Sequence, residues 1–409
     1  MTFRRYILFL LISTPFLSRA QLGFSLKEGQ HRIEFPIEIA NNLVIVPIIL
    51  NGQLPLKFIL DTGVRTTILT EKSFSNILKL TYSRRYSIAG PGGEKIVEAY
   101  ITNNVTLDMP GVHGQGHAML VLEKDYLELR NYLGTDVQGV LGYEVFSRFV
   151  VEVDYERRRL ALTLPKYFKP KKNFEVLHIS IEDTKPYIQV PIEMYDGKVI
   201  NAKLLVDSGA SHGLMLDPAS SKMICVPEKH VNSLIGRGLG GLITGQIGRI
   251  KSLNLGKYRI ESPIVSFPDT NSYIDTLKAS DVFRNGSVCG EILSRFTTIF
   301  NFPEEKMYLK KNSYFEKKFY FNMSGLTLKA MGAGLRKYEI TDVRKDSDAE
   351  RAGIEDGDEL VMINGLPTSE MDLNNINGYF NTTPGKKIKM EIIHQGQRIA
   401  KVILLESPI

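Results

Sequence analysis

The chain has 409 residues, of which 43% are hydrophobic and 23% are charged, a composition typical of folded globular proteins. This length allows roughly two to four domains, and the composition excludes a disordered chain. The formal charge of +6 falls to +3 without residues 1–20, which contain three arginines and no acid. So small an excess predicts no nucleic-acid partner.

The first twenty residues have the pattern of a secretory signal peptide. Arg4 and Arg5 precede an apolar run over residues 6–17, and small residues stand at positions 18 and 20, before a predicted cleavage site. The run is shorter than the roughly 20 apolar residues that a membrane span requires. We therefore expect an exported protein, periplasmic or secreted, with no stable membrane span after cleavage. An uncleaved membrane anchor is the alternative.

Two motifs repeat along the chain at nearly the same spacing. Residues 58–63 (FILDTG) are matched by residues 204–209 (LLVDSG), 146 positions later. Residues 139–149 (GVLGYEVFSRF) are matched by residues 286–296 (GSVCGEILSRF), 147 positions later. Two matches at almost one offset indicate a duplicated unit.

Both copies of this unit are predicted to be rich in β-strands. Runs of Val, Ile and Leu are separated by turn signals such as Asp196-Gly197. We expect a first lobe over residues 21–165, a second lobe over residues 174–312 and a Pro- and Lys-rich connection over residues 165–172. Each lobe also contains a glycine-rich segment, whose glycines are Gly90, Gly92 and Gly93 in the first and Gly238, Gly240 and Gly241 in the second.

The last part of the chain, residues 319–409, alternates short strands with two helical stretches. Ser347 is a predicted helix N-cap, and Gly353 ends the same short helix. Asn364-Gly365 predicts a tight hairpin turn, and residues 371–380 can form the second helix. The sequence therefore predicts a separate α+β domain here.

The repeated Asp-Thr/Ser-Gly motif suggests a pair of catalytic carboxylates. Asp61 and Asp207 each follow three apolar residues, and a buried carboxylate needs a partner because burial disfavours its charge. If the two strands meet across a two-fold axis, the aspartates share one proton and can act as general acid and general base on a water molecule. Their support is expected from the hydroxyls and backbone amides of the neighbouring residues Thr62, Gly63, Ser208 and Gly209.

At these residues the chain resembles the pepsin and retropepsin clan of aspartic proteases, specifically bacterial retropepsin-like proteins with two lobes and a trailing PDZ domain. The resemblance implies a mainly β fold with two pseudo-symmetric lobes and an aspartic endopeptidase that acts on polypeptides without a cofactor. It also implies that residues 140–142 and 287–289 cross beneath the aspartate turns. The glycine-rich segments would then be flaps that cover an extended substrate.

Three residues depart from this family pattern and keep an alternative function open. Val64 stands where Ala or Ser is usual, Cys289 replaces the expected glycine, and Ser287 is unusually polar. A non-catalytic peptide-binding or scaffolding protein with a degenerate cleft is therefore the alternative, and a self-processing zymogen is another. Cys225 and Cys289, the two cysteines, can form one disulfide in an oxidising compartment.

Histidines offer weaker candidate sites. His113 and His117 have a helical ligand spacing, but the glycines between them disfavour a helix and no third ligand is evident. No metal is therefore predicted. His212 lies three residues beyond the second motif and can approach the cleft or have a structural role.

The C-terminal segment resembles a PDZ domain through its Ser-x-Ala-x-x-Ala-Gly, Gly-Asp and Ile-Asn-Gly motifs. By this resemblance, Ser324, Gly325 and Leu326 belong to the loop whose backbone amides capture a peptide C-terminus. The expected partners are therefore peptide C-termini. The alternative is a domain that only packs on the protease and stabilises it.

Overall fold

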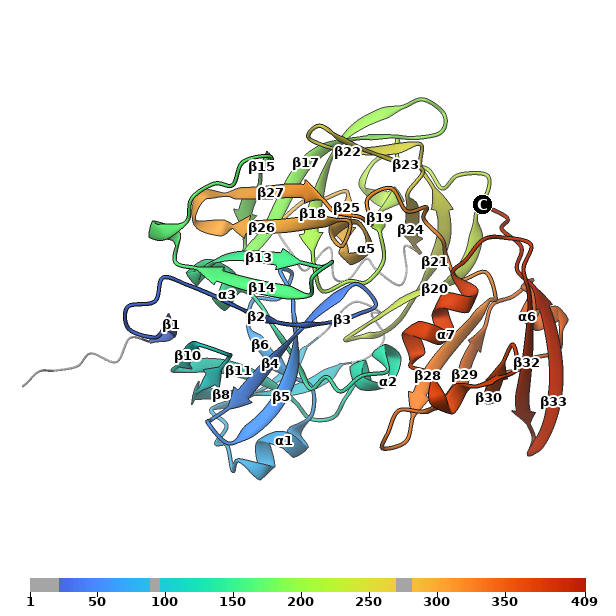
Figure 1. The fold of residues 1–409 in the computed structure, drawn as a ribbon, viewed down its shortest axis with the longest axis horizontal. Helices are drawn as coiled ribbons and strands as arrows, with labels where there is room; N and C mark the ends of the chain where they lie inside the picture. Colours follow the sequence, from blue (N-terminus) through green and yellow to red (C-terminus); the bar gives the residue numbers. More distant parts are fainter. Residues whose placement is uncertain (1–21, 89–95, 270–281) are drawn as a thin grey trace, which may run out of the picture.

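The computed structural model describes residues 22–88, 96–269 and 282–409, and its strands form five sheets within these ranges. The predicted signal peptide lies outside the described residues. Figure 1 shows the second-lobe strands above, the first-lobe strands below and the C-terminal strands to the right. No helix in the described ranges combines the length and apolar character needed to span a membrane.

The first-lobe sheet has nine strands. They are β3 (Glu38–Ala40), β4 (Leu43–Leu50), β5 (Leu54–Leu60), β6 (Thr67–Leu69), β7 (Arg84–Ile88), β8 (Val97–Val105), β9 (Leu107–Asp108), β11 (His117–Leu122) and β12 (Gly139–Leu141). Three short helices accompany it in the described ranges, namely α1 (Lys72–Ile77), α2 (Leu129–Leu133) and α3 (Tyr143–Arg148). A two-stranded sheet of β1 (Gly23–Leu26) and β10 (Val112–Gln115) lies beside it.

The second-lobe sheet has ten strands. They are β16 (Ser180–Glu182), β17 (Lys185–Glu193), β18 (Val199–Asp207), β19 (Leu214–Leu216), β20 (Val231–Gly238), β21 (Gly241–Arg249), β22 (Ser252–Leu255), β23 (Tyr258–Glu261), β24 (Ile264–Pro268) and β25 (Gly286–Cys289). The short helix α5 (Gly290–Leu293) follows the last of these strands.

Both lobe sheets use the same strand order around their centres. The order β4-β5-β12-β6-β11 in the first lobe corresponds to β17-β18-β25-β19-β24 in the second. In each lobe the strand that leads to the aspartate pairs in parallel with the later repeat strand, β5 with β12 and β18 with β25. This arrangement confirms the duplication and the mainly β fold predicted from the repeats.

A third sheet of six strands joins the two lobes. It contains β2 (Arg32–Pro36), β13 (Val150–Asp154), β14 (Arg159–Thr163), β15 (Glu175–His178), β26 (Phe296–Asn301) and β27 (Lys306–Lys311). Strands β13 and β26 come from different lobes and pair antiparallel at its centre. Because each lobe contributes three adjacent strands and the two sets pair through β13 and β26, this sheet fixes the position of one lobe relative to the other.

The C-terminal sheet follows the order β28-β29-β30-β32-β33 and leaves β28 at one edge. Its strands are β28 (Leu326–Met331), β29 (Lys337–Val343), β30 (Glu359–Ile363), β31 (Leu366–Pro367), β32 (Lys387–His394) and β33 (Gln397–Leu404), and its helices are α6 (Asp348–Arg351) and α7 (Leu373–Phe380).

Local signals in this domain act as predicted. The amide of Glu350 donates to the Ser347 hydroxyl at 3.2 Å, which caps α6, and Gly353 follows with a φ of +67°. Asn364 and Gly365 both have positive φ, at 49° and 82°, as a tight hairpin turn requires.

Candidate active site

Asp61 and Asp207 each stand at the end of a central strand. Strand β5 ends at Leu60, directly before Asp61, and Asp207 is the last residue of β18. The amide of Gly63 donates to Asp61 Oδ1 at 2.6 Å, and the amide of Gly209 donates to Asp207 Oδ1 at 3.0 Å. Hydrogen bonds to a charged acceptor are strong, so each turn fixes the direction of its own carboxylate.

The two turns are joined by hydrogen bonds through Thr62 and Ser208, both buried. Each main-chain amide donates to the hydroxyl of the opposite turn, at 3.1 Å from Thr62 and 3.0 Å from Ser208. Each hydroxyl also donates across the interface, Thr62 to the Val206 carbonyl at 2.6 Å and Ser208 to the Leu60 carbonyl at 2.9 Å. The hydroxyls therefore link the two turns as the sequence predicted.

The aspartate side chains lie against each other's turns. A methyl group added at Gly209 would lie 2.1 Å from Asp61 Cγ, and one added at Gly63 would lie 3.6 Å from Asp207 Oδ1. Only glycine fits at position 209, because any side chain there would occupy the space of the Asp61 carboxylate. The structure thus brings the two repeated motifs together around one pair of carboxylates.

Burial changes the acidity of this pair. Loss of water raises the pKa of Asp61 above its ordinary value, and the negative charge of Asp207 raises it further. The amides of Gly63 and Gly209 and the positive charge of Lys185 act in the opposite direction and offset only part of the increase. Two carboxylates this close cannot both ionise readily, so one shared proton persists toward neutral pH.

The later repeat strands cross beside the aspartate turns. Asp61 N donates to the Leu141 carbonyl at 2.8 Å, and Cys289 lies opposite Asp207 in the pairing of β18 with β25. A methyl group at Gly142 would meet the Val64 carbonyl at 2.0 Å, so the first lobe requires glycine here. The second lobe instead accommodates the Cys289 side chain, fully buried.

The possible disulfide between Cys225 and Cys289 is absent. Both cysteines are free, with Cys225 exposed and Cys289 buried. Burial and the charge of Asp207 raise the pKa of the Cys289 thiol, which favours the neutral form. The sequence left this pairing open, and in the structure Cys289 instead serves as a small buried side chain beneath the second turn.

Each lobe also contacts the aspartate turn of the other through a hairpin. Asn42 Nδ2 donates to the Ser211 carbonyl at 3.1 Å, and Arg65 pairs with Asp183 at 3.5 Å. Sequence reasoning missed both contacts. The Asn41-Asn42 pair was the available signal, because asparagines favour the positive φ of tight hairpin turns, 47° and 63° here.

Two further side chains lie within electrostatic reach of the pair. Lys185 lowers the pKa of Asp61, and sequence reasoning gave no sign of it. Burial lowers the pKa of His212, while the charge of Asp207 acts in the opposite direction. Among the described residues, His212 Nε2 is a buried nitrogen without a hydrogen-bond partner. The sequence had offered both a cleft position and a structural role for this histidine.

The second glycine-rich segment forms a hairpin, which we call the flap hairpin (residues 231–249). Strands β20 and β21 pair antiparallel, and the predicted residues Gly238, Gly240 and Gly241 lie at its tip. Leu239 at this tip packs against the apolar cluster of the first lobe, against which Val64 also packs. The hairpin therefore reaches across to the first lobe beside its aspartate turn. Gly90, Gly92 and Gly93 lie outside the described residues.

His113 and His117 bind different partners. His113 Nδ1 lies 2.6 Å from Asp108, and the buried His117 places Nδ1 2.9 Å from Glu144 Oε2. The same Glu144 oxygen accepts a hydrogen bond from Thr67. Within the described ranges, His, Cys, Asp and Glu form no cluster of three that could hold a metal.

The predicted carboxylate-binding loop of the C-terminal domain is largely bonded within itself. The amide of Ser324 donates to Asn322 Oδ1 at 3.0 Å, and the amide of Leu326 donates to Ser324 Oγ at 3.1 Å. Gly325 has a φ of +84°, which explains the glycine. Two of the amides expected to capture a peptide carboxylate are thus already satisfied.

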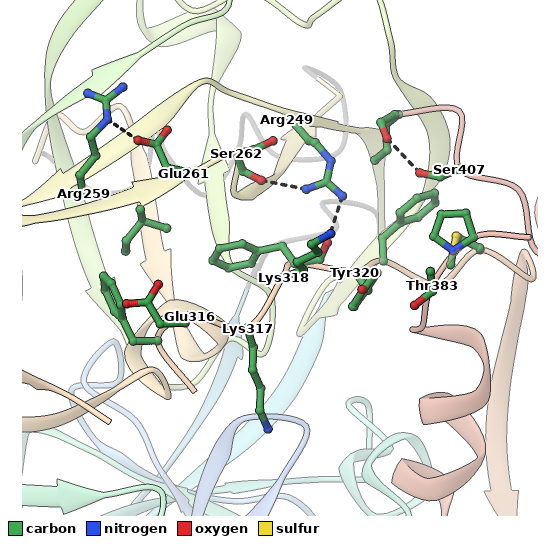
Figure 2. A pocket seen from close by; sticks show the side chains of 17 residues that line it. Arg249, Arg259, Glu261, Ser262, Glu316, Lys317, Lys318, Tyr320, Thr383 and Ser407 are labelled. Carbon is green, nitrogen blue, oxygen red and sulfur yellow. Dashed lines mark hydrogen bonds and ion pairs between the residues drawn. The ribbon is translucent and has the colours of Figure 1, made fainter. Parts of the chain in front are cut away.

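A cavity of about 620 Å³ lies at the junction of the second lobe and the C-terminal domain. Figure 2 shows Arg249 between Ser262 and the segment of residues 317–321. Its guanidinium donates to the Ser262 carbonyl at 2.8 Å and to the Phe319 carbonyl at 3.0 Å. The lining residues include neither aspartate, so this cavity is separate from the carboxylate pair.

Comparison with known families assigns both parts of this architecture. A model of the aspartyl protease family matches residues 46–145, which include Asp61 and its turn. A PDZ domain model matches residues 339–393. The chain combines an aspartyl protease domain with a C-terminal PDZ domain. A search of curated proteins gives no match to this chain. The family match ends before Asp207, so the assignment of Asp207 to the site rests on the internal repeat and on the matching strand order of the two lobes.

Proposed function

We propose that the protein is an aspartic endopeptidase that hydrolyses peptide bonds with a water molecule activated between Asp61 and Asp207. The observation that carries this proposal is the position of each carboxylate against the glycine of the opposite turn, with a shared proton favoured by burial. The ionised carboxyl accepts a proton from the water as it attacks. The protonated carboxyl donates to the oxygen of the scissile carbonyl, and no covalent intermediate forms.

The surroundings of the pair support an extended polypeptide as the substrate. The flap hairpin reaches from the second lobe to the first, beside the turn of Asp61, where it can cover an extended chain. The predicted signal peptide supports the further proposal that these polypeptides lie outside the cytoplasm. The PDZ domain supplies a second peptide site that can retain substrates or peptide C-termini near the cleft, where tethering raises their local concentration.

Substitution of either aspartate tests the dyad. Asp61→Asn and Asp207→Asn should each lower peptide hydrolysis by at least about a thousandfold, because one carboxylate cannot be both acid and base. The assay uses mature protein, a peptide library and mass spectrometry across pH, with inhibition by a statine peptide as a second readout. The matched control is Asp196→Asn, which alters an exposed carboxylate in a hairpin turn.

Two results would count against this function. Substantial hydrolysis by either dyad variant would show that another group performs the chemistry. If folded wild-type protein binds peptides but cleaves none between pH 3 and 8, the chain is instead a peptide-binding protein with an inactive cleft.

A further inference from the structure

The groove of the PDZ domain contacts a segment of the first lobe. We call residues 128–134, which contain α2, the docking segment. Asn131 Nδ2 donates to the Ala330 carbonyl on β28 at 2.7 Å, and Arg130 Nη2 donates to the Ala333 carbonyl at 2.7 Å. Figure 1 shows α2 beside β28 and α7. These contacts place the docking segment along the edge strand of the C-terminal sheet.

The docking segment also reaches the other wall of this groove. A methyl group added at Gly134 would lie 2.6 Å from Cβ of Leu373, the first residue of α7. The edge of β28 and helix α7 are the two walls between which a PDZ ligand adds as an extra strand. The Asn131 amide therefore binds a carbonyl that a bound peptide would use for its own backbone N–H.

The two faces of α2 have different roles. Leu133 belongs to the apolar cluster of the first lobe, and Leu129 packs against that cluster. Arg130 and Asn131 instead face the C-terminal domain with polar groups. The helix is thus anchored in the first lobe by apolar contacts, whereas its contacts with the PDZ domain are hydrogen bonds that a peptide backbone can replace.

Glu128 connects the PDZ domain to the flap hairpin. One carboxylate oxygen pairs with Lys329 of β28, and the other lies 3.5 Å from Arg237 Nη1 of β20. Arg237 also donates to the Tyr132 hydroxyl at 2.9 Å, with its guanidinium 4.8 Å from the centre of that ring. One short segment thus holds a residue of the flap hairpin and a residue of the PDZ edge strand.

The backbone at this junction is held in an uncommon conformation. Glu128 has a φ of 50°, in the left-handed region that residues other than glycine rarely adopt. The half-buried carboxylate of Asp125 accepts hydrogen bonds from the amides of Leu127 and Glu128, at 3.1 and 2.7 Å. The orientation of the Glu128 side chain therefore depends on the turn over residues 125–128, which the Asp125 carboxylate stabilises.

We propose that the docking segment is an internal occupant of the PDZ groove, and that an extended peptide which displaces it releases the flap hairpin. In the docked state Glu128 and Tyr132 hold Arg237, which keeps the hairpin against the first lobe. A peptide that pairs with β28 takes the Ala330 carbonyl and separates Lys329 from Glu128. The effect of this release on cleavage rests on the proposed protease function. The coupling between the PDZ groove and the flap hairpin does not, because it is a property of the fold.

Hydrogen exchange in the full chain tests this coupling. The variant Arg130→Ala with Asn131→Asp removes both donors to the PDZ domain and leaves Glu128, Tyr132 and Arg237 intact. Exchange should become about fivefold faster or more in β28 and also in the flap hairpin, as expected for coupled sites. Asn103→Asp, an exposed asparagine on the first-lobe sheet, is the matched control and should change neither region.

The experiment is best made in the Asp61→Asn background, because exchange then reports on conformation without any hydrolysis. Unchanged exchange in β28 would show that the segment does not occupy the groove. Faster exchange in β28 alone would show that the groove and the flap hairpin are independent, and either result overturns the proposal. In protein with intact aspartates, the same Arg130→Ala, Asn131→Asp variant should also raise kcat/KM for short peptides. If this protein hydrolyses no peptide at all, the result counts against the protease function and not against the coupling of the groove to the flap hairpin.

Discussion

Asp61 links the chemistry of the site to the stability of the fold. Its pKa is raised in the folded protein, so the folded state retains a proton that the unfolded chain has already released. This contribution to stability is fully present below the ordinary pKa of aspartate, about 4, and is lost as pH rises through the folded value. The carboxylate pair should therefore make the wild-type protein less stable at neutral than at acidic pH.

The Asp61→Asn variant should escape this loss because an amide does not titrate. We expect its melting temperature, relative to wild type, to rise by about 2 °C or more between pH 4 and pH 8. Thermal unfolding at both pH values measures the difference. For Asp196→Asn the melting temperature relative to wild type should instead fall between pH 4 and pH 8, since Lys198 lowers the pKa of that exposed carboxyl. An equal shift for Asp61→Asn at both pH values would contradict a raised pKa.

The two aspartate turns are joined by the buried hydroxyl groups of Thr62 and Ser208, which lie just after strands β5 and β18. Ser208→Ala leaves the buried Thr62 amide and the Leu60 carbonyl without their partner, and should destabilise the protein by about 2 kcal/mol. Thr62→Val removes the equivalent bonds and should have a similar effect. Thermal unfolding and peptide hydrolysis measure both variants. Ser208→Thr keeps the hydroxyl and is the control; if it is as damaging as alanine, volume rather than hydrogen bonding explains the loss.

The sequence predicted those elements whose signals are local or repeated. The two aspartate turns were found because a short motif occurs twice, and the caps of α6 were found because Ser347 and Gly353 act within one helical turn. The sequence could not decide the Cys225–Cys289 pairing, because burial of Cys289 depends on the strand beside it. The docking of α2 on β28 joins residues about 200 positions apart, and no spacing in the sequence indicates such a contact.

At the scale of the whole molecule, the two lobes and the PDZ domain share one apolar core. Buried side chains of both lobe sheets, of the sheet that joins them and of the C-terminal domain belong to a single cluster that includes Phe58, Leu204, Phe300 and Ile340. Domains joined in this way transmit a change at one surface more readily than domains on flexible linkers. The hydrogen bonds from the docking segment to the PDZ domain lie at the margin of this core. A peptide can replace them there without disturbing buried apolar contacts.

One chain contains both halves of the carboxylate pair, and this predicts that the monomer is the active species. The six-stranded sheet aligns the lobes through pairs such as Val151 with Phe300, so a second copy is not needed to bring Asp207 to Asp61. Specific activity should therefore stay constant over a thousandfold dilution, roughly from micromolar to nanomolar, while sedimentation follows the oligomeric state. A mixture of the Asp61→Asn and Asp207→Asn proteins provides the control, because neither contains an intact pair. Recovery of activity in that mixture, or loss of wild-type activity together with a dimer, would show that the site forms between chains.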